Sequence, residues 1–207
     1  MAKKTKNSAF KVGLLGESPN DTKAVAKLLA PRYGGQVEFF TLVDNVTGDN
    51  LDTQGAFRQL RREYQFEQPN LVVVIRDLDA LETDRAKLRQ RRKYFRDVNT
   101  QVNGKALYLL SIYTIEALIA AHIDSFNTHY GCQCTINGDV MLIEKPIELL
   151  RAATATSKTQ YLEGHCAELL AKADYNTLLS NCRYFRDFDA ELQAKLPARP
   201  AAPETAA

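Results

Sequence analysis

The stretch from Leu71 to Asp79 constrains the fold more than any other part of the sequence. It begins with the branched apolar run Leu71 to Ile75 and ends in two acids one residue apart, Asp77 and Asp79. A continuous apolar run of this length, bounded by a Pro-Asn pair and by charge, predicts a strand that is buried on both faces. Because alternate residues at a strand end point to one side, we expect both carboxylates to face one site.

The N-terminal half of the chain alternates between predicted strands and predicted helices. The strands are expected at 9–15, 37–43, 71–75 and 106–112, and the helices at 19–33, 54–66, 83–102 and 114–126. This alternation predicts an α/β fold, a three-layer core around a mostly parallel sheet. Right-handed crossovers would bring the carboxyl ends of the strands to one rim of that sheet.

The C-terminal part of the chain is predicted to extend the same domain. A short hairpin is expected over 131–143, around Asn137-Gly138, followed by helices at 146–153, 161–173 and 176–196. We therefore divide the 207 residues into a disordered leader (1–8), an α/β core (9–125), a hairpin and helical extension of the same domain (126–196) and a disordered Pro/Ala tail (197–207).

Composition predicts a cytoplasmic protein with no membrane partner. No apolar run approaches the roughly 20 residues that a spanning helix needs. The basic N-terminus lacks the apolar stretch of a secretory signal, and the four cysteines are scattered. Such cysteine usage is typical of a reduced cytosolic setting rather than of a disulfide framework.

Four acids that could act together follow three of the four predicted strands. Glu17 follows the first, Asp77 and Asp79 follow the third, and Glu116 follows the fourth. Each acid alone is equally well explained as a turn former or as a residue of a helix first turn. Together on one rim they would repel one another, by about 4 kcal/mol for two charges about 4 Å apart at an effective dielectric constant near 20. Hard divalent cations relieve such repulsion, so the pattern predicts bound Mg²⁺ or Mn²⁺.

Basic residues are concentrated in two of the predicted helices. A solvated helix face is the simpler explanation, and a surface that contacts the phosphates of a nucleic acid is the alternative. The candidate phosphate contacts are Arg58, Arg61, Arg62, Arg85, Arg89, Arg92 and Lys93.

Two lysines beyond the core could serve the same rim. Lys145 and Lys158 are candidates for holding a scissile phosphate, although an exposed lysine is the simpler explanation for each. The sequence has no phosphate-binding loop of the Gly-x-x-x-x-Gly-Lys-Ser/Thr type, no Gly-x-Gly-x-x-Gly after the first strand and no nucleophile elbow. These absences disfavour ATP hydrolysis, dinucleotide binding and serine hydrolase chemistry.

Three short motifs resemble the toprim domain, over roughly residues 9–121. They are Gly16-Glu17, Arg76-Asp77-Leu78-Asp79 and Ile115-Glu116-Ala117, and they look most like the small toprim-like proteins related to the overcoming-lysogenization-defect (OLD) nucleases. That resemblance implies Mg²⁺-dependent phosphodiester chemistry on DNA or RNA. It also implies an ATPase partner encoded nearby and a role in anti-phage defence.

The resemblance assigns roles to individual residues. Glu17 would be a metal ligand or general base, Asp77 and Asp79 metal ligands, and Glu116 a supporting or second-metal ligand. Relatives often show Glu-Gly and then Thr-Glu after the first strand, where this chain has Ser18 and Asn20-Asp21, and on this resemblance Asp21 would take the place of the second acid.

Two other functions remain open from the sequence. The chain could be a non-catalytic subunit that an ATPase holds, with leucines of the closing helices at the contact. It could also be a receiver-like phosphoacceptor domain, although such a domain needs an acidic pair after the first strand, where Glu17 stands alone.

Overall fold

The computed structural model of the chain describes residues 9–44 and 47–197. Four parallel strands form one sheet in the order β2-β1-β3-β4. Their bounds are β1 Phe10–Leu15, β2 Val37–Thr41, β3 Leu71–Asp77 and β4 Ala106–Ser111. The all-parallel sheet between two helical layers confirms the predicted three-layer α/β fold. The predicted leader, and the predicted tail apart from Pro197, lie outside the described residues.

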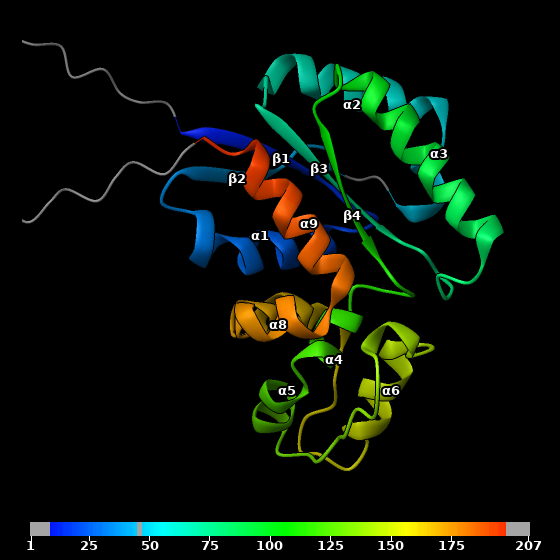
Figure 1. Cartoon of the computed structure of the whole chain (residues 1–207), viewed down its shortest axis with the longest axis vertical. Coiled ribbons are helices and arrows are strands. Elements are labelled where there is room, and N and C mark those ends of the chain that lie inside the picture. The colour runs from blue at the N-terminus through cyan, green and yellow to red at the C-terminus, as the bar shows by residue number, and fades with distance from the viewer. Residues whose placement is uncertain (1–8, 45–46, 198–207) are drawn as a thin grey trace, which may run out of the picture.

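Helices cover both faces of the sheet. Figure 1 shows α2 (Gln54–Glu67) and α3 (Arg85–Gln101) on one face, and α1 (Pro19–Tyr33) with α9 (Arg183–Lys195) on the other. The β3 strand explains the need for both layers, because Val73 and Ile75 enter the core beneath α1 while Val72 and Val74 enter the core beneath α2 and α3. A strand with apolar side chains on both faces is stable only when both faces are covered.

Local sequence explains how α1 begins at the carboxyl end of β1. Ser18 is the N-cap residue and its side chain accepts from Asp21 N, while the Asp21 carboxylate accepts from Ser18 N at 2.9 Å. Pro19 occupies the first turn, where a missing N–H has no cost. This capping box fixes the turn that carries Glu17.

The helices from α4 to α8 lie beyond the carboxyl end of the sheet, where Figure 1 shows α4, α5, α6 and α8, and from here on we call them the helical extension, although they begin before the predicted boundary at residue 126. Its helices are α4 Ala117–Ala121, α5 Ile123–Tyr130, α6 Pro146–Ala153, α7 Cys166–Ala171 and α8 Tyr175–Asn181. It also contains the 3₁₀ turns η2 Val140–Leu142 and η3 Glu163–His165. A further 3₁₀ turn, η1 Gly48–Asn50, lies elsewhere in the fold and precedes α2. None of the helices in the described part of the chain is both long and apolar enough to span a bilayer.

The predicted hairpin over 131–143 is wrong, because this segment contains no strand. The chain does bend at Gly138, whose φ is 92°. The preceding residues, however, bond to α5 instead of to a second strand. Asn127 donates to Cys134 O and accepts from Cys134 N, each at 2.8 Å, so one side chain satisfies the backbone groups that a hairpin partner would otherwise bind.

Two predicted helices are each divided into two, and a third is shorter than expected. The predicted helix 114–126 starts only at Ala117 and breaks at His122 (ψ 56°), and the predicted helix 176–196 breaks at Cys182 (ψ 100°). The predicted helix 161–173 is reduced to η3 and α7. Neither break contains Gly or Pro, and at each one a side chain reaches a distant backbone group. His122 Nδ1 accepts from Asp174 N, and Asn181 Nδ2 donates to Ala121 O.

The buried carboxylate of Asp189 in α9 connects this helix to α1 and α8. Asp189 is 3% exposed, and its carboxylate accepts hydrogen bonds from the hydroxyls of Tyr33 and Tyr175. Gln193 Nε2 donates to the other oxygen at 2.6 Å. These bonds hold α1, α8 and α9 together, because a buried carboxylate is tolerated only when it is well satisfied.

The Tyr175→Phe substitution is expected to lower the free energy of unfolding by about 1–2 kcal/mol, because it removes one hydrogen bond to a buried charged acceptor. Urea unfolding followed by circular dichroism would measure the change. The control is Tyr113→Phe, because the Tyr113 hydroxyl makes no hydrogen bond within the described residues, and its cost should stay below about 0.5 kcal/mol. Equal decreases in the free energy of unfolding for the two substitutions would show that the hydrogen bond from Tyr175 to Asp189 does not stabilise the fold.

Candidate functional site

An acidic cavity of about 170 Å³ lies at the carboxyl end of the sheet. Five carboxylate side chains line it, and no Lys or Arg of the described residues does. The five are Glu17, Asp21, Asp77, Glu116 and Glu163. Glu17 follows β1, Asp21 is in α1, Asp77 ends β3 and Glu116 precedes α4. The structure therefore brings three of the four predicted acids, Glu17, Asp77 and Glu116, to one cavity.

Glu17 and Asp77 are immediate neighbours. Glu17 Oε1 accepts a hydrogen bond from Asp77 N at 2.9 Å, which fixes one oxygen of Glu17 at the end of β3. Gly48 of η1 approaches the other oxygen so closely that a Cβ atom there would lie 2.6 Å from Glu17 Oε2. The Glu17 carboxylate is thus positioned by the backbone of two other segments.

Arg76 provides the positive charge behind Glu17. Its side chain is 2% exposed, and Arg76 Nε lies 2.8 Å from Glu17 Oε1, as an ion pair whose N–H is not aligned for a hydrogen bond. Arg76 Nη1 donates to Asp52 Oδ1 at 3.1 Å, and the guanidinium lies 4.6 Å from the centroid of the Tyr94 ring. Arg76 points to the opposite face from the acidic cavity, and so it links Glu17 to the layer of α2 and α3.

Burial and mutual repulsion make ionisation costly in the acidic cavity. Burial raises the pKa of Asp77 well above its ordinary value, and the nearby charges of Asp21, Glu17, Glu116 and Asp79 add to the rise. Burial likewise raises the pKa of Asp21 to about 6, although the hydrogen bonds from Ser18 oppose this rise. The cavity is an unfavourable place for several free carboxylates and a favourable one for a cation.

Glu116 reaches the cavity from the far wall. It is 3% exposed and accepts a hydrogen bond from Tyr161 Oη at 3.1 Å. The Cys166 thiol lines the cavity beside it, and burial raises the pKa of Cys166, with smaller contributions from Glu116, Asp21 and Asp77. The helical extension therefore closes the cavity with the first residue of α7 and with Ile147 of α6.

Asp79 does not line the acidic cavity. The β3 strand ends at Asp77, and Asp79 adopts a left-handed backbone conformation with φ 54°, so strand alternation does not extend to it. Its carboxylate, which is 48% exposed, pairs instead with Arg91 Nη2 at 2.7 Å. The expectation that the carboxylates of Asp77 and Asp79 face one site is therefore wrong, because the backbone turns after β3 and the Asp79 side chain points to Arg91 instead of into the cavity.

Neither predicted lysine lines the cavity. Lys145 is exposed, precedes α6 with φ 52°, and pairs with Glu148 at 3.0 Å. Lys158 is exposed in the loop after α6. Besides Arg76, two basic groups of α3 contact the end of β3, since Lys87 and Arg91 donate to the backbone oxygens of Asp79 and Asp77 at 2.9 and 2.7 Å.

The seven predicted phosphate contacts are all exposed on α2 and α3. Three of them have partners: Arg61 bonds to Gln101, Arg62 pairs with Glu63 and Lys93 pairs with Asp97. The other four form no ion pair or side-chain hydrogen bond within the described residues, and these are Arg58, Arg85, Arg89 and Arg92. Helix α3 begins near the carboxyl end of β3, where Lys87 and Arg91 bond to the backbone of Asp79 and Asp77, but no residue of α2 or α3 lines the acidic cavity among the described residues.

The donor chemistry of the cavity fits a hard divalent cation, because its polar lining is dominated by carboxylate oxygens. With the side chains as they stand, no three Asp, Glu, His or Cys residues of the described segments are close enough together to hold a metal ion. Ligation would therefore require rotation of carboxylates, and of these only Glu17 is held through an ion pair and a backbone amide together.

Glu163 and Cys166 line the cavity but were not predicted from the sequence. Asp21 was expected there only as a substitute for the second acid of the toprim pattern, and its local signature is that of a capping box. Arg76 precedes the two acids, so its position predicts a side chain on the opposite side of the strand that pairs with an acid, and the structure pairs it with Glu17 and Asp52.

Comparison of the chain with known protein families, with curated proteins and with solved structures finds no match. What connects the chain to a functional class is therefore the three acidic motifs and the cavity to which they contribute.

Proposed function

We propose that this protein is a metal-dependent nuclease of the toprim type, which uses Mg²⁺ or Mn²⁺ to hydrolyse phosphodiester bonds of DNA or RNA. The observation that carries the proposal is the acidic cavity, in which carboxylates from the β1–α1 connection, β3 and the β4–α4 connection meet and, of these three, only Glu17 is paired with a basic side chain among the described residues, Arg76. A doubly charged cation bridging to a phosphate is the usual solution to such a gathering of acids.

Glu17, Asp77 and Glu116 would hold the cation, with Asp21 as a further oxygen donor and Asp79 as a ligand if it exchanges Arg91 for the metal. A divalent cation at this position supplies charge neutralisation at phosphate oxygens and acidifies a bound water. Glu17 is the best candidate for the general base, because Arg76 and the Asp77 amide fix its carboxylate from behind. A fixed carboxylate receives a proton at a defined atom without reorganisation.

The direct test is to incubate the purified chain with single- and double-stranded DNA and RNA in Mg²⁺, in Mn²⁺ and in EDTA. The assay should be repeated with any ATPase encoded beside it, because a freely active nuclease would damage its host. Cleavage that requires the divalent ion is expected. Cleavage that continues in EDTA, or no cleavage under any of these conditions, would refute the proposal.

Gly48→Ala is expected to lower cleavage by about tenfold to a hundredfold with little loss of stability. The new Cβ would displace Glu17 Oε2, which is the end of a side chain and can move, so the fold tolerates the change although the carboxylate is misplaced. The matched control is Gly55→Ala in α2, where the nearest atom to a new Cβ lies at 3.6 Å. Equal activity of the two variants would show that the Gly48 approach does not position Glu17.

Removing three arginines from α3 is expected to weaken nucleic acid binding about equally for all sequences. The triple substitution of Arg85, Arg89 and Arg92 by Gln should reduce the slope of log K against log salt by about 3, or about 1 for each arginine removed. Fluorescence anisotropy over a salt series would measure the slope. Replacing Lys23 and Lys27 of α1, on the opposite face of the sheet, is the control and should leave the slope unchanged.

A non-catalytic subunit of an ATPase remains the alternative, but the leucines of the closing helices do not offer the contact that it needs. Leu169, Leu170 and Leu178 are buried in the core, and Leu179 is partly buried against it. An ATPase partner would have to bind elsewhere on the surface.

A further inference from the structure

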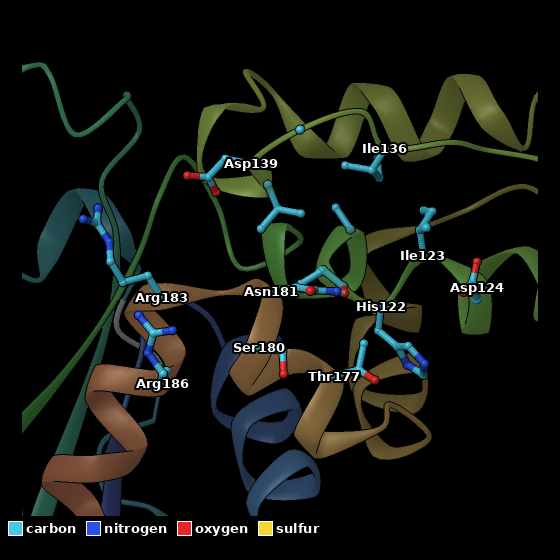
Figure 2. A pocket seen from close by; sticks show the side chains of 14 residues that line it. His122, Ile123, Asp124, Ile136, Asp139, Thr177, Ser180, Asn181, Arg183 and Arg186 are labelled. Carbon is cyan, nitrogen blue, oxygen red and sulfur yellow. Dashed lines mark hydrogen bonds between the residues drawn. The ribbon is translucent and has the colours of Figure 1, made fainter.

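A second cavity, of about 560 Å³, opens on the side of the helical extension. Its walls are the α4–α5 junction at His122, the loop that leads into η2, and the junction between α8 and α9 (Figure 2). We call it the arginine cavity, because Arg183 and Arg186 stand at one end of it. None of the acids of the acidic cavity lines it, so it is a separate site.

The arginine end can bind an oxyanion. Arg183 and Arg186 occupy the first turn of α9, and their side chains are 50% and 54% exposed. The nearest carboxylate to Arg186 is that of Asp187 at 3.9 Å, which is a weak contact. The N-cap residue of α9, Cys182, makes no capping hydrogen bond, so the helix dipole adds to the positive charge of the two guanidinium groups. Arg183 pairs with Glu82, whereas Arg186 has only the weak contact with Asp187, and one guanidinium group can bind two oxygens of a phosphate.

The rest of the lining fits a ligand that carries hydroxyl groups on one side and an apolar group on the other. Thr177, Ser180 and Asn181 of α8 lie along the floor of the cavity (Figure 2). Asn181 Nδ2 donates to Ala121 O, whereas Asn181 Oδ1 has no hydrogen-bond partner within the described residues. Asp139 Oδ1 accepts from Met141 N at 2.8 Å, so the second oxygen of Asp139 and the carboxylate of Asp124 are the lining acceptors for sugar hydroxyls, as acidic residues are in dinucleotide sites.

Ile123 and Ile136 provide the apolar wall (Figure 2), and the volume lies within the roughly 300–1,000 Å³ typical of small-molecule sites. We propose that the arginine cavity binds a phosphorylated small molecule of nucleotide size. Its phosphate lies at Arg183 and Arg186, its hydroxyls lie along α8, and its apolar part contacts Ile123 and Ile136. This binding does not depend on the proposed nuclease activity.

The same geometry connects the cavity to the segment between β3 and α3. Arg183 Nη2 pairs with Glu82 Oε2 at 2.5 Å, and the Tyr184 hydroxyl donates to the same oxygen. Glu82 follows Asp79 by three residues. A phosphate at Arg183 competes with Glu82 for the guanidinium, so ligand binding loosens the hold of α9 on the segment that carries Asp79.

Isothermal titration calorimetry on the full chain tests the proposal. The titrants are inorganic phosphate, ribose 5-phosphate, adenosine and AMP, all in EDTA so that no metal-bound phosphate forms at the acidic cavity. We expect AMP or ribose 5-phosphate to bind at least about tenfold more tightly than inorganic phosphate, and adenosine to bind weakly. Equal binding of inorganic phosphate would overturn the assignment of the sugar-binding part. A dissociation constant above about 1 mM for every phosphorylated titrant would overturn the site.

Substitutions in and near the arginine cavity test whether the phosphorylated titrants bind there. Arg186→Ala should weaken it by about tenfold or more, whereas Glu82→Gln should strengthen it several-fold, because Arg183 loses its competing carboxylate. Arg151→Ala is the matched control, since Arg151 also pairs with an exposed acid but lies outside the cavity. Thermal melts confirm folding, and Arg186→Lys keeps the charge if the alanine variant does not fold. Unchanged affinity in both Arg186 variants, or weaker binding by Glu82→Gln, would overturn the proposal.

Discussion

Replacing Glu17 by Gln, or Asp77 by Asn, is expected to lower metal-dependent cleavage by at least about a hundredfold. Groups that only support a metal ligand are typically worth about 10- to 100-fold, and these two carboxylates would contact the cation directly. Both substitutions keep the side-chain size. In Glu17→Gln the amide oxygen would still accept from the Asp77 N–H, but Arg76 would lose one of its two carboxylate partners, so the stability of this variant is measured beside its activity.

Measurements of thermal stability distinguish a loss of metal binding from a loss of folding in these variants. Without divalent ions, Asp77→Asn is expected to raise the melting temperature, because it removes a charge that burial and four neighbouring carboxylates disfavour. Added Mn²⁺ should then stabilise the native protein but not the Asp77→Asn variant. The control for activity is Glu148→Gln, an exposed acid paired with Lys145 outside the cavity. Undiminished cleavage by the Glu17 and Asp77 variants would remove the basis of the proposed function.

Arg76→Ala is expected to lower the free energy of unfolding by about 3 kcal/mol, and to abolish cleavage as well. Removing one member of a buried ion pair typically costs about 3–5 kcal/mol, and we expect the lower end because Glu17 and Asp52 retain some contact with water. The substitution also removes the cation from the face of Tyr94 and leaves a void beneath α3. Chemical denaturation would measure the change.

Two further variants locate the cause of that loss. Arg76→Met fills most of the volume without the charge, so it should recover part of the stability and none of the activity. Arg58→Ala in α2 is the control, because this exposed arginine forms no ion pair within the described residues, and it should change stability by less than about 0.5 kcal/mol. An Arg76→Ala variant as stable as the control would show that the ion pair with Glu17 has no structural role.

The sheet and the meeting of Glu17 with Asp77 could be predicted from the chain alone. The apolar runs of β1 and β3 exceed what a half-exposed strand carries, and the alternation with helices requires a parallel order. Once the strands are parallel neighbours, the residues that follow them share a rim. The capping box at Ser18 further determines where α1 begins, within a few residues of Glu17.

The orientation of the other acidic and basic groups could not be predicted in this way. Asp79 turns away because the backbone takes a left-handed conformation just past the strand, and strand alternation ends there. The breaks at His122 and Cys182 depend on bonds to Asp174 and Ala121, which are 52 and 60 residues distant from the bonding side chains. The absence of a hairpin likewise depends on Asn127 of α5.

Local patterns in the chain are enough to specify a parallel α/β sheet with acids following its strands, because hydrophobic periodicity and capping act over a few neighbouring residues. Long-range packing alone establishes which acids share a cavity, that Arg76 supports Glu17 from the opposite face, and that Cys166 and Tyr161 close the far wall beside Glu116. Those contacts join segments far apart in the chain, so they depend on which distant side chains arrive together rather than on any local pattern.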